Sequence, residues 1–137
     1  MLVIRSEQLE VFRPIADDKF TSRLIAYVLA QHPGTLVKLP GGNRRVVDLP
    51  PGALDRLVNT GIARARSRGL TWESSIAAFV TLMFVASPNF DTDPLIDSLL
   101  SRKDKPADLR IDDILHETPP AVWRSVADTY LPGAWIS

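Results

Sequence analysis

The spacing of hydrophobic residues predicts a mainly α-helical protein. Apolar side chains recur at three- and four-residue steps over most of the chain, which is the spacing of one helix face. The 11 prolines are spread along the sequence and divide it into segments of helical length. We therefore expect a single domain over residues 1–137, built as a compact bundle of about five to six helices.

The longest stripe predicts a first helix that begins near Ser6, a good N-cap, and ends before Pro33. Pro14 lies inside this helix and removes a backbone hydrogen bond, so we expect a kink there. The stripe keeps its phase across the proline. It consists of Leu9, Phe12, Ala16, Phe20, Leu24 and Val28.

A second helix is expected to open at Asp48 or at Pro50–Pro51 and to end at Gly69, which suits a left-handed cap. Thr71 is the expected N-cap of a third helix, which should end at Pro88. The third helix is apolar nearly all round, so we expect it at the centre of the bundle. The core residues expected from these two helices are Leu54, Leu57, Val58, Ile62, Ala65, Ile76, Phe79, Val80, Met83 and Phe84.

Three shorter helices follow in the prediction. The pair Asp93–Pro94 is a strong helix start and introduces a helix over 95–101. A further short helix is expected over 108–115. The last helix starts at Thr118–Pro119 and ends at Pro132–Gly133, with Val122, Trp123, Val126, Ala127 and Tyr130 facing inward.

Two segments depart from the helical pattern. Residues 35–50 contain two extended runs, 35–39 and 45–49, around the turn 40–43, and we expect a β-hairpin or loop insertion there. Residues 131–137 form an apolar C-terminal tail. Trp135 in this tail has two alternatives: it folds back onto the last helix and completes the core, or it stays available to a partner.

Composition excludes several classes of chemistry. The chain has no cysteine, which removes disulfides, thiolate nucleophiles and cysteine-based metal sites. It has two histidines, and neither has a neighbour at metal-ligand spacing. The longest apolar run, 76–86, is shorter than the roughly 20 residues of a membrane span. We expect a cytoplasmic protein with no metal, no cofactor, no catalytic residue and no membrane contact.

Four acidic or amide side chains, Asn89, Asp91, Asp93 and Asp97, imitate the start of an EF-hand calcium loop. The imitation fails where the loop needs glycine and a bidentate glutamate, so we expect a turn and a helix cap instead. Asp91 and Asp93 also form a carboxylate pair, which leaves a small hydrolase as an alternative.

The charges balance overall but are unevenly distributed. Residues 38–68 hold seven basic and two acidic side chains, a net of +5, whereas residues 73–117 hold four basic and nine acidic, a net of −5. Mutual neutralisation within the fold is one interpretation, and a bipolar surface that orients a protein partner is the other. The basic segment has no interleaved aromatics, so no nucleic acid is expected as a partner, although a transcriptional regulator remains an alternative.

Three stretches, 61–73, 79–84 and 87–94, together with the opening residues 1–8 and Phe12, carry a family resemblance. They resemble a family of small helical bacterial proteins that are encoded in type VI secretion gene clusters, near PAAR-repeat spike proteins, effectors and effector-loading chaperones. The chain departs from the family at Pro14, in the longer 34–51 segment and after Pro119. The resemblance implies a non-enzymatic accessory protein, such as a co-chaperone, in effector assembly. It brings no active-site residues with it.

The resemblance therefore predicts a protein partner: an effector, an effector chaperone or a PAAR-type spike protein. An immunity-type protein that neutralises a toxin is the alternative. Specificity commonly lies on variable segments held by a rigid scaffold, and Trp and Arg are enriched at binding hot spots. We expect partner binding by Arg44 and Arg45 near the hairpin tip and by Trp135 and Ile136 in the tail.

Overall fold

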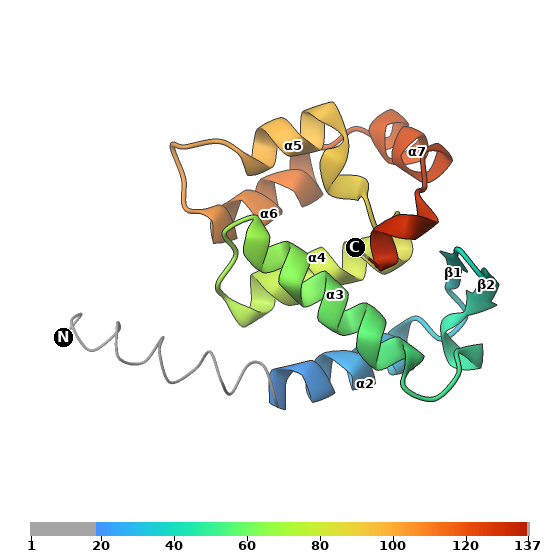
Figure 1. Ribbon diagram of the computed structural model, residues 1–137. Coiled ribbons are helices and arrows are strands. Elements are labelled where there is room, and N and C mark those ends of the chain that lie inside the picture. Colours follow the sequence, from blue (N-terminus) through green and yellow to red (C-terminus); the bar gives the residue numbers. More distant parts are fainter. Residues whose placement is uncertain (1–18, 137) are drawn as a thin grey trace.

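The structure is a computed structural model, and it describes residues 19–136. Within this part the chain forms six α-helices, one two-stranded hairpin and three short 3-10 helices, which confirms a mainly helical bundle with a small β-hairpin (Figure 1). The elements in chain order are α2 (Thr21–Gln31), β1 (Leu36–Leu39), β2 (Gly42–Arg45), η2 (Val46–Asp48), α3 (Ala53–Ser67), α4 (Glu73–Val85), η3 (Phe90–Thr92), α5 (Pro94–Leu100), α6 (Ala107–Glu117), α7 (Pro120–Asp128) and η4 (Pro132–Trp135).

Helix α4 lies at the centre, as its all-round apolar sequence predicts. It packs against α3 and α6, while α3 also packs against α2, and α5 packs against α6. In Figure 1 the hairpin and α7 lie together at one side of this bundle. The expected start of the first helix at Ser6 and the expected kink at Pro14 lie outside the described residues.

Gly61 allows α3 and α4 to approach closely. A Cβ atom at this position would lie 3.0 Å from Val80 Cγ2 and 3.2 Å from Met83 Sδ. Both of these neighbours are fully buried in the core. The glycine is therefore required by the packing of the two central helices.

Gly69 ends α3 as predicted, with a φ of 90° in the left-handed region. Its N–H donates to the Arg66 carbonyl at 2.9 Å, and the next N–H, of Leu70, donates to the Ala65 carbonyl at 3.3 Å. This is the Schellman arrangement, and the buried Leu70 side chain accompanies it.

Two predicted helix starts need correction. Of the two alternatives for the second helix, Asp48 is wrong because it belongs to η2, and Pro50–Pro51 lies just before the observed start. Helix α3 begins at Ala53, after Gly52 with a φ of 81°. Thr71 does not cap α4. Its hydroxyl donates to Asp108 Oδ2, while Asp108 Oδ1 accepts the backbone N–H groups of Thr71 and Trp72. A carboxylate from α6 therefore fixes the two residues that precede α4, and no side chain caps the first turn of that helix.

The hairpin exists, but its second strand was predicted too late in the sequence. Strands β1 and β2 pair antiparallel with Leu39 opposite Gly42, so the turn is only Pro40–Gly41. The expected second run, 45–49, is mostly the 3-10 helix η2, in which Val46 is buried. The tight two-residue turn brings Gly42 and Asn43 into the sheet despite their low strand propensity.

The last helix is shorter than predicted. Helix α7 ends at Asp128, and Ala127 is exposed rather than inward-facing, whereas Val126 is buried as expected. After α7 the chain turns back toward the hairpin, and η4 contacts both β1 and α3. The tail therefore packs onto the domain instead of leaving it.

Candidate functional site

Asp91 is a buried carboxylate held by Arg64 of α3 and by Arg68, the residue that follows α3. Arg64 donates to its Oδ1 at 2.9 Å, and Arg68 Nε donates to its Oδ2 at 2.9 Å. Arg68 Nη2 also donates to the Asp91 backbone carbonyl at 2.6 Å. Asp91 is only 2% exposed. All of these contacts are charge-assisted, so Asp91 joins α3 to the loop before α5.

Arg68 extends this cluster to a second carboxylate. Its Nη1 donates to Asp97 Oδ1 at 2.6 Å. Burial lowers the pKa of Arg68, but the hydrogen bonds to Asp97 and Asp91 outweigh burial and hold that pKa above its ordinary value. The guanidinium stays charged and works as a structural clamp.

The polar side chains that imitate a calcium loop have separate tasks. Asp93 caps α5, accepting from the N–H groups of Leu95 at 3.0 Å and Ile96 at 3.2 Å, as predicted. Asn89 Nδ2 donates to the Thr129 carbonyl, and its Oδ1 accepts from Leu131 N–H. Through these two hydrogen bonds Asn89 fastens the end of α7 to the core. No group of three or more potential metal ligands occurs among residues 19–136.

A groove lies where the hairpin, α3 and the tail meet, and we call it the hairpin–tail groove. Its volume is about 600 Å³. It is lined by Leu39, Pro40, Gly41, Gly42, Arg44, Pro50, Ala53, Arg56, Leu57, Thr60, Trp135 and Ile136. Three of the four residues expected to bind a partner, Arg44, Trp135 and Ile136, thus come together in one place.

The strand register explains why Arg45 is not among them. Arg44 lies opposite the fully buried Val37, so both face α3 and the tail. Successive side chains of a strand point to opposite faces, so Arg45 points away from the groove. Both arginines are exposed, but only Arg44 lines the groove.

Trp135 packs into the core, the first of its two alternatives. It is 1% exposed, its ring centre lies 4.8 Å from that of Phe84, and its Nε1 donates to Tyr130 Oη at 2.8 Å. The same hydroxyl accepts from the backbone N–H of Lys38 at 3.1 Å. Tyr130 therefore links β1 to the tail. Ile136, by contrast, is 72% exposed at the groove.

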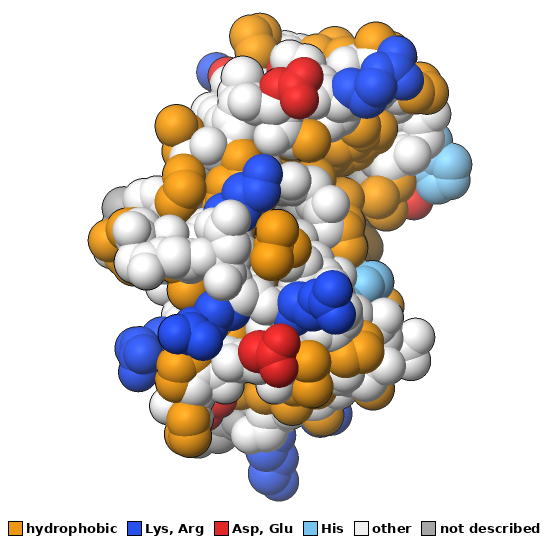
Figure 2. All heavy atoms as spheres, turned by 90° about the vertical axis from the view of Figure 1, so that its right-hand side faces the viewer, with side chains coloured by type: hydrophobic (Ala, Val, Ile, Leu, Met, Phe, Trp, Pro, Cys, Tyr) orange, Lys and Arg blue, Asp and Glu red, His pale blue; other side chains and the backbone are white. Residues whose placement is uncertain are grey.

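The basic segment divides into two parts. Arg64 and Arg68 are neutralised by Asp91 and Asp97, which supports the interpretation of mutual neutralisation for this end of α3. Of the remaining basic residues, Arg44 and Arg56 line the hairpin–tail groove. No ion pair joins Arg44, Arg45 or Arg56 to an acidic group within residues 19–136. Figure 2 shows Lys and Arg side chains spread among hydrophobic ones on the hairpin side of the molecule.

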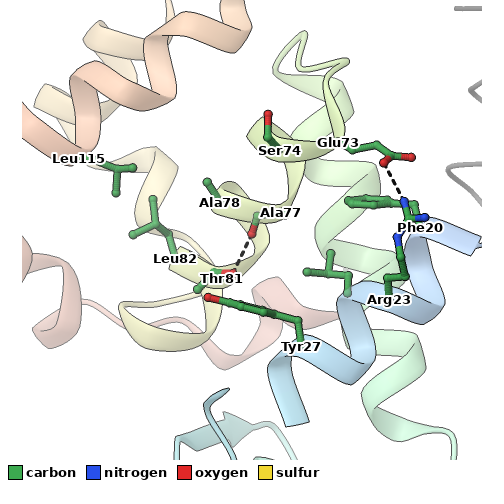
Figure 3. A pocket seen from close by; sticks show the side chains of 11 residues that line it. Phe20, Arg23, Tyr27, Glu73, Ser74, Ala77, Ala78, Thr81, Leu82 and Leu115 are labelled. Atoms are coloured by element: carbon green, nitrogen blue, oxygen red, sulfur yellow. Dashed lines mark hydrogen bonds and ion pairs between the residues drawn. The ribbon is translucent and has the colours of Figure 1, made fainter. Parts of the chain in front are cut away.

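A second groove separates α2 from α4 (Figure 3), also of about 600 Å³. Tyr27 and Arg23 approach it from α2, and Ala77 and Thr81 approach it from α4. Arg23 is paired with Glu73 at 2.7 Å across its end. This groove is therefore less cationic than the hairpin–tail groove, and its lining is mostly apolar.

Comparison with protein-family models, curated proteins and solved structures found no match to this chain. None of the helices between residues 19 and 136 is long and apolar enough to cross a bilayer.

Sequence reasoning missed several groove residues. Arg56 is one of the seven basic residues of the 38–68 segment, but Thr60 has no separate signal in the sequence. Their four-residue spacing places both on the helix face that lines the groove. Tyr130 was expected in the core of the last helix, yet it lies beyond α7 and its hydroxyl organises the hairpin. Its aromatic ring and polar tip are the one local signal for such a link.

Proposed function

We propose that the protein is a non-enzymatic, cytoplasmic adaptor or co-chaperone that assists the loading or assembly of a type VI secretion effector through protein–protein binding. The resemblance of residues 61–94 to accessory proteins of type VI secretion clusters suggests this role. The observation that carries it is the hairpin–tail groove, where uncompensated cations and exposed apolar atoms meet. The hairpin and the tail, which form two of its walls, lie outside the family pattern. Such a combination is typical of binding surfaces on a rigid scaffold.

Deletion and complementation in the native host test the proposal. Without the gene, less effector should be found on its PAAR-type carrier, and its delivery to target cells should fall. The wild-type gene should restore both, and a variant with an occluded groove, Thr60→Trp, should not. Unchanged carrier loading in the deletion strain would remove the adaptor proposal.

The immunity alternative is separated by a different readout. An immunity protein protects a cell that produces the toxin without any other component of the secretion system. Co-expression of the two genes in a heterologous host therefore decides between these functions. Protection in that host, with effector loading unaffected by the deletion, would favour immunity.

The hydrolase alternative depends on Asp91 and Asp93, whose oxygens are engaged by Arg64, Arg68 and the first turn of α5. Asp93→Asn is its cleanest test, because asparagine caps a helix about as well as aspartate. Loss of biological activity in this variant with unchanged melting would favour the hydrolase.

A further inference from the structure

The hairpin–tail groove has an apolar floor and a cationic rim. Leu39, Leu57 and Trp135 contribute to the floor, and Arg44 from β2 and Arg56 from α3 lie at the rim. Its volume of about 600 Å³ lies within the usual range of binding sites. An occupant that matches it needs a large apolar group for the floor and negative charge for the rim.

The cations at the groove differ from those at the other end of α3 in having no acidic partner among the described residues. Arg64 and Arg68, farther along the helix, already bind carboxylates within the fold. Arg44 and Arg56 have no such partner within residues 19–136, and the groove lining includes no Asp or Glu among these residues. A guanidinium beside apolar surface binds a carboxylate through two hydrogen bonds in fixed geometry, which gives both attraction and specificity.

The edge of the groove at the hairpin tip suits a partner segment with an extended backbone. A Cβ atom on Gly41 or Gly42 would have no atom within 4 Å, so the hairpin tip exposes its backbone there. Glycine lets another backbone approach closely. In the described part of the chain, the sheet contains β1 and β2 alone, and the Lys38 N–H on β1 is already bound by Tyr130. The other edge, on β2, is left for an added segment.

We infer that the hairpin–tail groove binds an extended peptide segment of a partner protein in which acidic side chains flank a large apolar residue. The apolar side chain enters the floor beside Leu57, and the carboxylates bind Arg44 and Arg56. The inference deepens the proposed function and rests on it for the claim that the segment belongs to a protein of the secretion apparatus.

The experiment selects peptides of about six to eight residues, a common strand length, from a random display library on the full-length protein. The peptides are fused to the carrier through their C-termini, so that the acidic groups come from side chains. Enriched peptides should carry Asp or Glu on both sides of Leu, Ile, Met or Phe. Enrichment of basic or uncharged peptides, or no enrichment at all, would overturn the inference.

Matched variants then locate the binding site. Arg44→Glu and Arg56→Glu should each weaken the best peptide at least about tenfold, which corresponds to about 1.4 kcal/mol. Arg45→Glu, on the opposite face of the hairpin, and Arg124→Glu, an exposed arginine on α7, make the same charge change outside the groove and should have little effect. Equal losses in all four variants would mean non-specific charge attraction and would contradict the inference.

A bulky substitution that fills the groove tests the role of its apolar floor without changing the charge. Thr60→Trp should abolish peptide binding while the melting temperature stays near that of the wild type, because Thr60 is only half-buried at the groove wall. Unchanged peptide affinity in this variant would place the peptide elsewhere. Peptide binding without any effect of deletion on effector loading would remove the proposed function alone. Effector loading that survives Arg44→Glu and Thr60→Trp would remove the inference alone.

Discussion

Arg68 holds Asp91 by two contacts at once, one to the carboxylate at 2.9 Å and one to the backbone carbonyl at 2.6 Å. The backbone contact fixes the position of the loop as well as that of the side chain. Arg64, one turn earlier on α3, takes the remaining carboxylate oxygen. The loop before α5 is thus tied to α3 by a charge that has little access to water.

Asp91→Asn should destabilise the protein by about 3 kcal/mol, because it removes a buried charge and leaves two guanidiniums imperfectly paired. Urea unfolding measures this directly. Asp93→Asn is the matched control and should change the free energy of unfolding by only a few tenths of a kcal/mol, since both residues cap helices well. Equal stability of the two variants would contradict the clamp.

Gly61→Ala should destabilise the protein despite the higher helix propensity of alanine. Its Cβ would press on Val80 and Met83 in the packed interface of α3 and α4, and overpacking commonly costs about 1–3 kcal/mol. The gain in helix propensity is about 1 kcal/mol, so a net loss of up to about 2 kcal/mol is expected. Asn59→Ala, at an exposed site of the same helix, is the control and should be neutral or slightly stabilising. A rise in melting temperature for Gly61→Ala would show that the interface has room.

Tyr130→Phe should loosen the hairpin while leaving the helices folded. The change removes one hydroxyl that accepts from both Lys38 N–H and Trp135 Nε1, at an expected cost of about 1–2 kcal/mol. Hydrogen exchange is the informative measurement: the Lys38 amide should exchange faster than in the wild type, whereas amides in the middle of α4 should change only with global stability. Unchanged protection at Lys38 would rule out the link.

Trp135→Ala should lower the melting temperature, since it deletes a buried aromatic side chain at an expected cost of about 3–5 kcal/mol. Partner binding should weaken along with stability. Ile136→Ala is the contrasting change, because that side chain is exposed at the groove and its loss should affect binding more than melting. A normal melting temperature for Trp135→Ala would contradict its core position.

Acid should weaken the junction of α5 and α6. The Lys105 ammonium, with a smaller effect from Arg102, holds the pKa of Asp113 below its ordinary 3.8. The folded protein therefore releases this proton more readily than the unfolded chain. The stabilisation is complete above the unfolded pKa and is lost as pH falls through the lower folded pKa.

Urea unfolding from pH 5 down to pH 2 should show this loss. Asp113→Asn should be less stable than wild type at pH 5, with a smaller difference at pH 2. A constant difference in the free energy of unfolding between the two proteins across that range would show that the ion pair with Lys105 does not contribute to the acid sensitivity.

The helices could be predicted because each carries its own local signal. The stripe of α4, the Gly69 end of α3 and the Asp93 cap of α5 depend on residues close in sequence. Errors arose where a distant residue replaces a local one. Thr71 has the sequence pattern of a cap, but its hydroxyl and backbone N–H both donate to Asp108, 37 positions away. No local pattern reveals such a substitution.

The candidate site could be predicted only in part, for the same reason. Chain order gave no hint that Arg44 and Ile136 line one groove, because their meeting depends on the return of the tail after α7. The face of the hairpin on which Arg44 lies depends on the register set by the two-residue turn. Composition indicated the residue types of an interface, and the fold determined which of them can act together.

The fastening of the tail by Asn89 has a thermodynamic consequence for binding. Its side chain bonds to backbone groups of Thr129 and Leu131, just before the segment that forms one wall of the hairpin–tail groove. The loss of chain entropy needed to shape that wall is therefore incurred during folding, not on encounter with a partner. Because the groove wall is already ordered, binding has to offset only the conformational entropy that the bound segment itself loses. Binding should proceed close to rigid docking, and Asn89→Ala should reduce affinity through entropy without touching the bound segment.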